Sequence, residues 1–381
     1  MGQLCAMRTW SLIVLTLLWT SVAQAATLTL AWDASTSPDI AGYRLYWGNL
    51  PGTYVASADI GNQTSYQIAG LIDGFPYYFV VRAYNTSGMF SNPSVEVSRR
   101  VGVPFSVRGD FDRDFKADIT VFRPSTGTWY ARRSSTGAGA FFQWGMSSDV
   151  PALGDYDGDG RNDLAVFRPS TGIWYIKHSS TGASAFFQWG LSSDKPVPGD
   201  YDGDGRTDVA VFRPSTGMWY VWYSSTGSGA FFQWGLAGDV IVPGDYDGDG
   251  RTDAAVFRPS TGMWYINQSS TGTNAFFSWG LDGDVETPGD YDGDGKTDMA
   301  VFRPSTGMWY IRQSGTGSSA FYQWGLTGDV PVPGDYDGDG HADVAVFRPS
   351  TSIWYVRYST TGSGAFFQWG LTGDIPLLKA P

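Results

Sequence analysis

The 381-residue sequence predicts an all-β protein in which a small antiparallel sandwich is followed by a six-bladed β-propeller. The first observation is the composition: 50 Gly stand beside 17 Trp, 21 Tyr and 23 Phe, which is typical of many short strands joined by tight turns. The second is a set of short runs between residues 27 and 98 in which apolar and polar residues alternate. The third is an acidic segment that recurs every 45 residues, a period typical of propellers and other repeat folds.

Residues 1–25 predict a secretory signal peptide. An uncharged run from Trp10 to Val22 follows Arg8 and closes on Ala23-Gln24-Ala25, a small-x-small cleavage signature. The run is too short to span a bilayer. Cleavage would also remove Cys5, the single cysteine, so no disulfide would stabilise the mature chain. The sequence therefore predicts a secreted, extracellular protein without membrane insertion, stabilised by core packing or by metal.

The alternating runs of residues 27–98 predict the sandwich. Examples are Leu28–Trp32, Tyr43–Trp47 and Tyr78–Tyr84. This segment resembles a fibronectin type III domain, with Trp32 on an early core strand. The resemblance implies that Tyr77 is the corner tyrosine whose hydroxyl bonds back to the backbone.

The periodic part, residues 105–381, predicts the propeller, and residues 99–104 are expected to link it to the sandwich. Each 45-residue unit contains four strand-like runs, and runs such as Val209–Phe212 are apolar on both faces. Such strands are buried on both sides when four-stranded sheets stack around an axis. A further first-strand copy, Asp374–Leu378, follows the sixth unit and is able to complete the first blade and close the ring. Seven blades or an open curved array remain the alternatives.

Each unit carries an acidic loop with Asp at its first, third, fifth and ninth positions. In the second unit these are Asp155, Asp157, Asp159 and Asp163. Calcium takes six to eight oxygen ligands, and alternate carboxylates on a tight loop converge on one point. The backbone carbonyl at the seventh position, here that of Arg161, is expected to add another oxygen. Without a cation the four carboxylates would repel one another.

The loops resemble the calcium loops of FG-GAP/VCBS repeats, the family of integrin α-subunit propellers and many bacterial secreted proteins. The resemblance covers all six units and implies five or six Ca²⁺ per chain, because Arg113 and Phe115 replace loop glycines in the first unit. The implied ligands in the other units are Asp110, Asp112, Asp114 and Asp118 in the first; Asp200, Asp202, Asp204, Arg206 and Asp208 in the third; Asp245, Asp247, Asp249, Arg251 and Asp253 in the fourth; Asp290, Asp292, Asp294, Lys296 and Asp298 in the fifth; and Asp335, Asp337, Asp339, His341 and Asp343 in the sixth.

Charge and motif content favour a binding protein over an enzyme. The net charge of −12 disfavours nucleic acid and anionic membranes as partners, and 24 of the 37 acids belong to the loops. The two histidines, His178 and His341, occupy different repeat positions, and no nucleophile elbow or phosphate loop is present. We therefore expect no catalytic residue and a monomer that binds a glycan or a cell-surface protein. An extracellular polysaccharide-active enzyme and a structural spacer are the alternatives.

Three further sets of residues recur or vary in an informative way. Trp222 and Tyr223 occupy positions that differ in charge and size among the units, so they are the candidate ligand-contact pair. Two Trp per unit are expected in the core between blades. An Arg five residues after the last loop Asp is expected to pair with a nearby Asp or to pack along aromatic rings. These arginines are Arg123, Arg168, Arg213, Arg258, Arg303 and Arg348.

Overall fold

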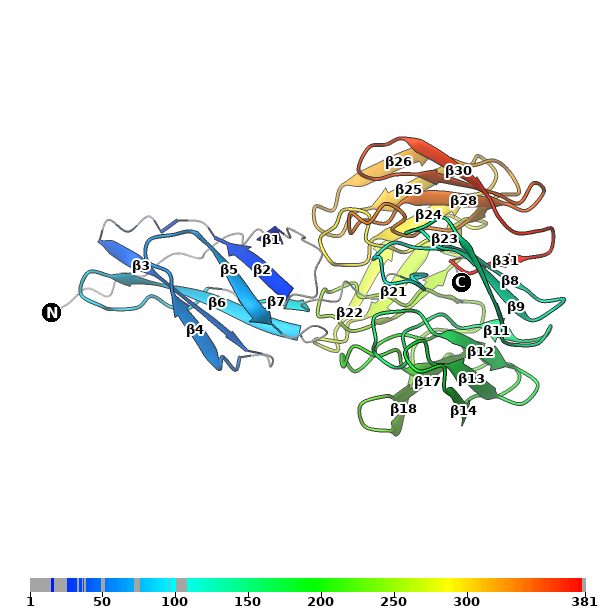
Figure 1. The fold of residues 1–381 in the computed structure, drawn as a ribbon, viewed down its shortest axis with the longest axis horizontal. Coiled ribbons are helices and arrows are strands. Elements are labelled where there is room, and N and C mark those ends of the chain that lie inside the picture. The colour runs from blue at the N-terminus through cyan, green and yellow to red at the C-terminus, as the bar shows by residue number, and fades with distance from the viewer. Residues whose placement is uncertain are drawn as a thin grey trace. The chain divides into compact units, whose positions relative to one another are not determined.

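The computed structural model of the chain describes residues 15–16, 26–32, 34–35, 37, 39–48, 52–71, 76–94, 96–100 and 108–378. These ranges fall into two compact units, Met1–Pro104 and Phe105–Pro381, and the regular elements in both are strands (Figure 1). The described residues contain no helix that is long and apolar enough to cross a membrane. The predicted signal peptide lies outside the described residues except for Leu15 and Thr16, as does the predicted linker from residue 101 onward.

The first unit is the predicted antiparallel sandwich. One sheet has the order β1-β2-β5 and the other β4-β3-β6-β7. Their core includes Leu28, Trp32, Tyr43 and Phe79, with the rings of Trp32 and Tyr43 5.8 Å apart. Tyr77 stacks on Phe79, whereas the bond from its hydroxyl to the backbone stays a prediction. The strands are β1 (Leu15–Thr16), β2 (Ala26–Ala31), β3 (Ile40–Gly48), β4 (Ala56–Asp59), β5 (Ser65–Leu71), β6 (Pro76–Asn85) and β7 (Val97–Arg100).

The described part of the second unit forms six four-stranded antiparallel sheets. In strand order they are β31 (Ile375–Pro376), β8 (Ile119–Arg123), β9 (Thr128–Arg132), β10 (Gly139–Gln143); β11 (Val150–Pro151), β12 (Leu164–Arg168), β13 (Ile173–Lys177), β14 (Ser184–Gln188); β15 (Lys195–Pro196), β16 (Val209–Arg213), β17 (Met218–Tyr223), β18 (Ser228–Gln233); β19 (Val240–Ile241), β20 (Ala254–Arg258), β21 (Met263–Asn267), β22 (Asn274–Ser278); β23 (Val285–Glu286), β24 (Met299–Arg303), β25 (Met308–Arg312), β26 (Ser319–Gln323); and β27 (Val330–Pro331), β28 (Val344–Arg348), β29 (Ile353–Arg357), β30 (Gly364–Gln368).

The C-terminal strand completes the first of these sheets. Strand β31 pairs with β8, so that Ile375 lies opposite Phe122, and both strands are visible side by side in Figure 1. The N–H of Leu377 extends the contact by donating to the carbonyl of Thr120 over 3.0 Å. Trp354 of the sixth sheet packs in one cluster with Trp129 of the first. The described strands therefore close on themselves through the spare strand that the sequence contains.

Tryptophans join each sheet to the next, as predicted. Trp174 is fully buried, and its indole N–H donates to the carbonyl of Trp189 over 2.8 Å. The indole N–H of Trp189 donates in turn to the carbonyl of Tyr220 in the following sheet over 3.1 Å. The same bond runs from Trp369 of the sixth repeat to Tyr130 of the first, also over 3.1 Å. Because buried indole N–H groups need acceptors, these bonds fix how neighbouring sheets pack.

Each sheet also holds one buried ion pair, in line with the expectation for the recurrent arginines. The guanidinium of Arg168 donates two hydrogen bonds of 2.8 Å to Asp149 and lies 4.0 Å from the ring centre of Tyr175. The corresponding carboxylates are at most 2% exposed, whereas the arginines are 18–22% exposed. The other pairs are Arg123–Asp374, Arg213–Asp194, Arg258–Asp239, Arg303–Asp284 and Arg348–Asp329.

We predict that Arg123→Ala lowers the unfolding free energy of the second unit by about 3 kcal/mol, because it leaves the buried carboxylate of Asp374 without its cation. Arg44→Ala is the matched control, since Arg44 pairs with Asp59 in the first unit with both side chains well exposed. Its expected cost is under about 1 kcal/mol. Denaturant unfolding of both variants checks this, and equal costs would contradict the role given to the buried pair.

Candidate metal centre

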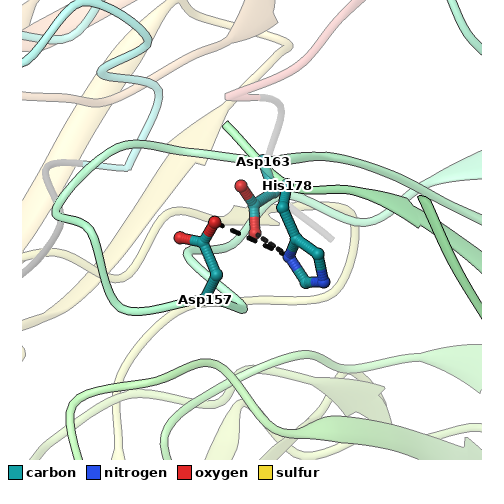
Figure 2. Close-up of side chains that lie close together, drawn as sticks. All are labelled: Asp157, Asp163 and His178. Atoms are coloured by element: carbon teal, nitrogen blue, oxygen red, sulfur yellow. Dashed lines mark ion pairs between the residues drawn. The ribbon is translucent and has the colours of Figure 1, made fainter. Parts of the chain in front are cut away.

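The acidic loop of the second sheet joins β11 to β12 and gathers its carboxylates on one side. Figure 2 shows the carboxylates of Asp157 and Asp163 turned toward the same ring nitrogen of His178. Oxygens of Asp155, Asp157 and Asp159 form a second group whose members lie within 4.8 Å of one another. The alternate spacing of the acids thus produces the convergence that the sequence predicts.

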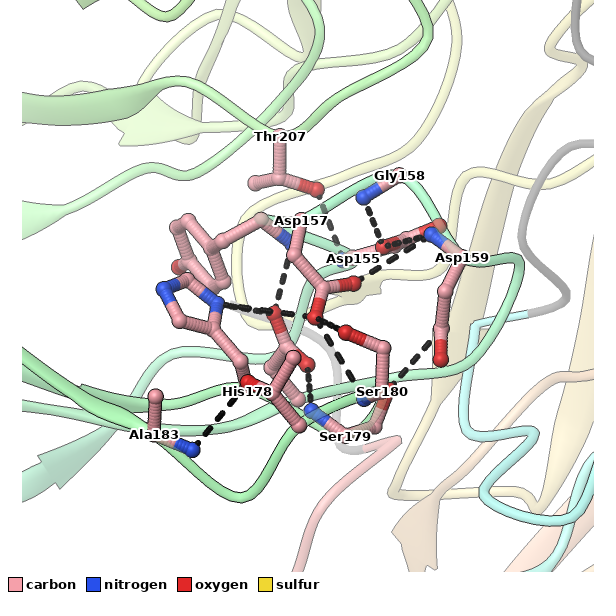
Figure 3. Close-up of polar contacts among 12 residues, drawn as sticks. Asp155, Asp157, Gly158, Asp159, His178, Ser179, Ser180, Ala183 and Thr207 are labelled. Atoms are coloured by element: carbon pink, nitrogen blue, oxygen red, sulfur yellow. Dashed lines mark hydrogen bonds and ion pairs between the residues drawn. The ribbon is translucent and has the colours of Figure 1, made fainter.

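The first Asp of the loop folds the backbone around its own carboxylate. Oδ1 of Asp155 accepts the N–H groups of Gly158 at 2.7 Å and Asp159 at 3.1 Å (Figure 3). Oδ2 of Asp155 accepts the N–H of Gly160 at 2.7 Å. Gly158 and Gly160 have φ values of 79° and 86°, which glycine adopts without the steric cost of a Cβ. The loop glycines therefore let three N–H groups point at one carboxylate.

A serine pair from the next turn of the same sheet holds the other carboxylates. Ser179 donates its N–H to Asp163 at 2.6 Å and its hydroxyl to Asp159 at 2.8 Å, while the hydroxyl of Ser180 donates to Asp157 at 2.5 Å. Sequence analysis gave this segment no role and missed its contact with the loop. The available signal was its fixed position 24 and 25 residues after the first loop Asp in most repeats.

Comparable groups of convergent carboxylate oxygens occur in other described loops. Those in the first, third and fourth repeats are Asp110, Asp112, Asp118; Asp200, Asp202, Asp208; and Asp245, Asp247, Asp249. In three loops the Oδ1 atom of the third-position Asp is buried and makes no hydrogen bond within the described residues; these are Asp112, Asp292 and Asp337. A buried carboxylate oxygen without a partner is costly, and a hard cation supplies the missing partner. The donor set therefore fits calcium.

The first loop keeps the same backbone despite its substitutions. Arg113 and Phe115 adopt φ values of 67° and 64°, the region that glycine occupies in the other loops. Their N–H groups donate to Asp110 at 2.6 and 2.9 Å, as the equivalent glycines do elsewhere. The side chains add backbone strain at these two positions, but the carboxylates of this loop are still brought together.

Backbone hydrogen bonds link the six loops into a closed series, which we call the acidic-loop belt. In each case the N–H of the eighth loop residue donates to the carbonyl of the first Asp of the preceding loop. The six bonds are Asn162 to Asp110 at 2.8 Å, Thr207 to Asp155 at 2.7 Å, and Thr252 to Asp200, Thr297 to Asp245, Ala342 to Asp290 and Ala117 to Asp335 at 2.6 Å each. The last of these joins the sixth loop to the first.

Cationic side chains cross between neighbouring loops in the belt. A Cβ built on Gly158 would lie 3.2 Å from Cγ of Arg206, the seventh residue of the next loop, and one on Gly338 would lie 3.0 Å from Cε of Lys116. The seventh-position side chains thus lean over the preceding loop. Ligation by the seventh-position carbonyl stays a prediction for Arg161, Arg206, Arg251, Lys296 and His341.

Burial raises the pKa of the loop carboxyls. The pKa rises to about 6 for Asp155 and to about 7 for Asp208 and Asp245, with desolvation as the main cause. Neighbouring loop carboxylates raise it further, while the backbone N–H donors lower it. Without a cation the charged form of these groups is therefore disfavoured in the folded protein.

The candidate ligand-contact pair is half-buried. Trp222 packs against the rings of Phe187 and Trp189 at centroid distances of 4.8 and 5.2 Å, between the second and third sheets. Burial, and then the charges of Asp208 and Asp202, raise the pKa of Tyr223, so this phenol lies beside its own acidic loop. A ligand-contact role for the two residues stays a prediction.

The raised pKa values predict an unusual pH dependence for the calcium-free protein. A carboxyl whose folded-state pKa lies above its ordinary value of 3.8 stabilises the fold while protonated, and this stability is lost as pH rises through about 7 for Asp118, Asp208 and Asp343. In chelator, Tm of the second unit is expected to fall as pH rises from about 4, near the ordinary pKa, to about 7, the raised pKa. With calcium the fall is expected to disappear, because calcium binds the deprotonated groups.

Thermal scans across this pH range check the expectation. Asp208→Asn provides the control, because the neutral amide removes one titrating group and reduces the slope in chelator. Identical slopes with calcium and with chelator would contradict a metal role for the loops.

Comparison with known proteins agrees with this architecture. Residues 200–256 and 290–346 match the model of an FG-GAP-like repeat, residues 149–187 match that of an FG-GAP repeat, and residues 18–97 match that of a fibronectin type III domain. A Kelch domain-containing protein of Saccharolobus solfataricus is 38% identical over 78 residues, which make up 20% of this chain and 10% of that protein. The match therefore spans about a tenth of the length of that relative.

Several solved propeller structures are similar at low sequence identity. The structure of a nidogen/laminin complex has a TM-score of 0.47 at 11% identity, over 66% of this chain and 93% of that chain. The structure of an Agrocybe aegerita lectin that recognises terminal N-acetylglucosamine has a TM-score of 0.43 at 18% identity, over 66% of this chain and 75% of that chain. The structure of virginiamycin B lyase from Staphylococcus aureus has a TM-score of 0.44 at 7% identity, over 69% of this chain and 88% of that chain. With its sandwich, four-stranded sheets and matched repeats, the chain is a fibronectin type III domain followed by a β-propeller of FG-GAP repeats.

Proposed function

We propose that this chain is an exported, calcium-stabilised and non-catalytic binding protein whose propeller recognises a polymeric glycan. The acidic-loop belt supports the calcium part of the proposal. It offers carboxylate oxygens in six loops, and three of the loops contain a buried oxygen that makes no hydrogen bond in the part of the chain that the structure describes. Oxygen-only donor sets on flexible loops suit calcium better than softer metals. Export rests on the N-terminal leader that the sequence predicts.

The observation that carries the binding part is a set of exposed phenylalanines, which we call the Phe set. One Phe on the fourth strand of each sheet is 53–76% exposed, and the Leu or Met five residues after it is 53–58% exposed. A regular pattern of large exposed apolar side chains is uncommon on a surface that contacts only water. The Phe set consists of Phe141, Phe186, Phe231, Phe276, Phe321 and Phe366.

Repetition of the Phe set favours a ligand that is itself repetitive. Similar apolar surfaces recur at the same position of every sheet, so a chain of identical sugar units can contact several of them at once. Weak contacts then add up, because each later contact is intramolecular. The apolar C–H faces of sugar rings pack well on aromatic rings. These features favour a polysaccharide over a single protein surface.

A hollow beside the Phe set supplies both aromatic and polar groups. It has a volume of about 160 Å³ and is lined by Trp189, Gly190, Leu191, Arg213 and Tyr220. Aromatic walls with a few fixed polar groups are the usual composition of small-ligand sites. Arg213 is held in place there by its ion pair with Asp194 and its stacking on Tyr220. The hollow is therefore rigid enough to accept one sugar unit.

The acids outside the belt support binding rather than hydrolysis. Burial raises the pKa of Glu286 to about 7, but Asp284, the acid that contributes to this rise, is bound in the ion pair with Arg303. Hydrolysis of a glycosidic bond ordinarily requires two carboxyl groups that flank the bond. A lone buried Glu does not meet this requirement.

We predict that the double variant Phe231→Ala/Phe366→Ala binds its polysaccharide roughly tenfold or more weakly while keeping the Tm of the wild type, because each exposed ring contributes contact but little core packing. The measurement is binding of the mature chain to a panel of polysaccharides, in calcium and in chelator. Val55→Ala is the matched control, since Val55 is an exposed apolar residue of the first unit. Unchanged binding of the double variant would contradict the role of the Phe set. Release of reducing or unsaturated ends would instead support the enzymatic alternative.

A further inference from the structure

The acidic loop of the second repeat has a neighbour that the other repeats lack. His178 follows β13 and precedes the serine pair that holds the loop carboxylates. The same position contains other residue types in the remaining repeats. These are Arg133, Tyr223, Gln268, Gln313 and Tyr358. The second repeat is therefore the one with an imidazole at this position.

The imidazole faces two loop carboxylates. Nδ1 of His178 lies 3.5 Å from Oδ2 of Asp163 and 3.7 Å from Oδ2 of Asp157 (Figure 2). One ligand atom from each of the three residues lies within 4.8 Å of the other two. Nδ1 is buried and makes no hydrogen bond within the described residues, although a quarter of the side chain is exposed. A buried ring nitrogen that points at two carboxylates without bonding to either is unusual.

The separations suit ligands of a shared small cation. Zinc bonds of about 2.0–2.1 Å in tetrahedral geometry put neighbouring donor atoms about 3.4 Å apart, close to the observed 3.5 and 3.7 Å. Calcium, by contrast, takes oxygen ligands. We propose that the second-repeat loop, in place of calcium, binds a divalent transition-metal ion of the zinc type through Nδ1 of His178 and the carboxylates of Asp157 and Asp163.

Neighbouring groups fix all three donors. The backbone of His178 is held by two hydrogen bonds, its N–H donating to the carbonyl of Ala183 at 2.9 Å and its carbonyl accepting the N–H of Gly182 at 2.8 Å. The hydroxyl of Ser180 donates to Asp157 and orients it (Figure 3). The N–H of Tyr156 donates to Oδ2 of Asp163 at 2.9 Å. Supports of this kind orient metal ligands and increase metal affinity.

A simple ion pair explains the contact less well. A protonated imidazole donates a hydrogen bond of about 2.7–2.9 Å to a carboxylate, which is shorter than either observed distance. The second histidine gives a comparison within the same chain. Nδ1 of His341 lies 3.3 Å from the backbone carbonyl of Tyr291, so a backbone oxygen already contacts it. His341 is therefore the matched control for His178.

The test is titration of the full mature chain with Zn²⁺ and Co²⁺ in saturating calcium, followed by calorimetry and by the visible absorption of Co²⁺. The wild type is expected to bind one such ion and to show the absorption of a nitrogen-ligated site. His178→Gln, which introduces the residue of the fourth and fifth repeats, is expected to bind more than about 100-fold more weakly, since even loss of an outer-shell partner costs 10- to 100-fold. His341→Gln is expected to bind like the wild type.

Two further variants make the result decisive. Gln268→His is expected to create a second site in the fourth repeat, and His178→Tyr, which introduces the residue of the third and sixth repeats, is expected to abolish the first while keeping the wild-type Tm in calcium. Equal Zn²⁺ binding by the wild type and His178→Gln would overturn the proposal. The proposal does not depend on calcium in the other loops: loss of calcium binding with retention of the His178 site would contradict the proposed function alone.

Discussion

Repulsion among buried carboxylates is the constraint on which the second unit depends. Each acidic loop turns its Asp side chains toward one point, and burial already disfavours their charged form. The acidic-loop belt then joins the loops through backbone bonds between neighbouring repeats. A loop that opens to separate its charges must therefore disturb the next loop as well. In the proposed function, a cation at each loop would remove the repulsion and let the belt hold the sheets together.

The belt is one of three sets of contacts that recur in every repeat. The indole N–H bonds join each sheet to its neighbour through buried Trp side chains, and the Arg–Asp pairs fix the start of each first strand against the second. Both the indole N–H bonds and the Arg–Asp pairs form between protein groups alone. The metal-dependent stability that we propose would therefore lie in the loops, whereas the packing of the sheets rests on residues such as Trp174 and Phe167. This separation explains how the repeats vary around the loops, as at His178, while the sheets stay alike.

The sequence was sufficient to predict the repeat, the spacing of the loop acids and the role of the spare C-terminal strand, because all three are periodic. Contacts between segments of one repeat were not predictable in the same way. The bonds of Ser179 and Ser180 to the loop depend on the shape of a separate turn. In runs such as Gly139–Gln143, two adjacent Phe are equally apolar, and strand pairing decides that Phe141 is exposed while Phe142 is not. The contacts of Trp222 were also unpredictable from its own repeat, because its partners lie in the preceding sheet.

The most direct test of the central claim is differential scanning calorimetry of the full mature chain with calcium and with chelator. At sites with Kd of about 10⁻⁴–10⁻³ M, roughly 1 mM calcium contributes about 0.4–1.4 kcal/mol per loop, so the five loops other than the second contribute about 2–7 kcal/mol if they are independent. The account predicts that chelation lowers the Tm of the larger transition, that of the propeller, and leaves the fibronectin type III transition in place. A propeller transition that does not move on chelation would contradict it.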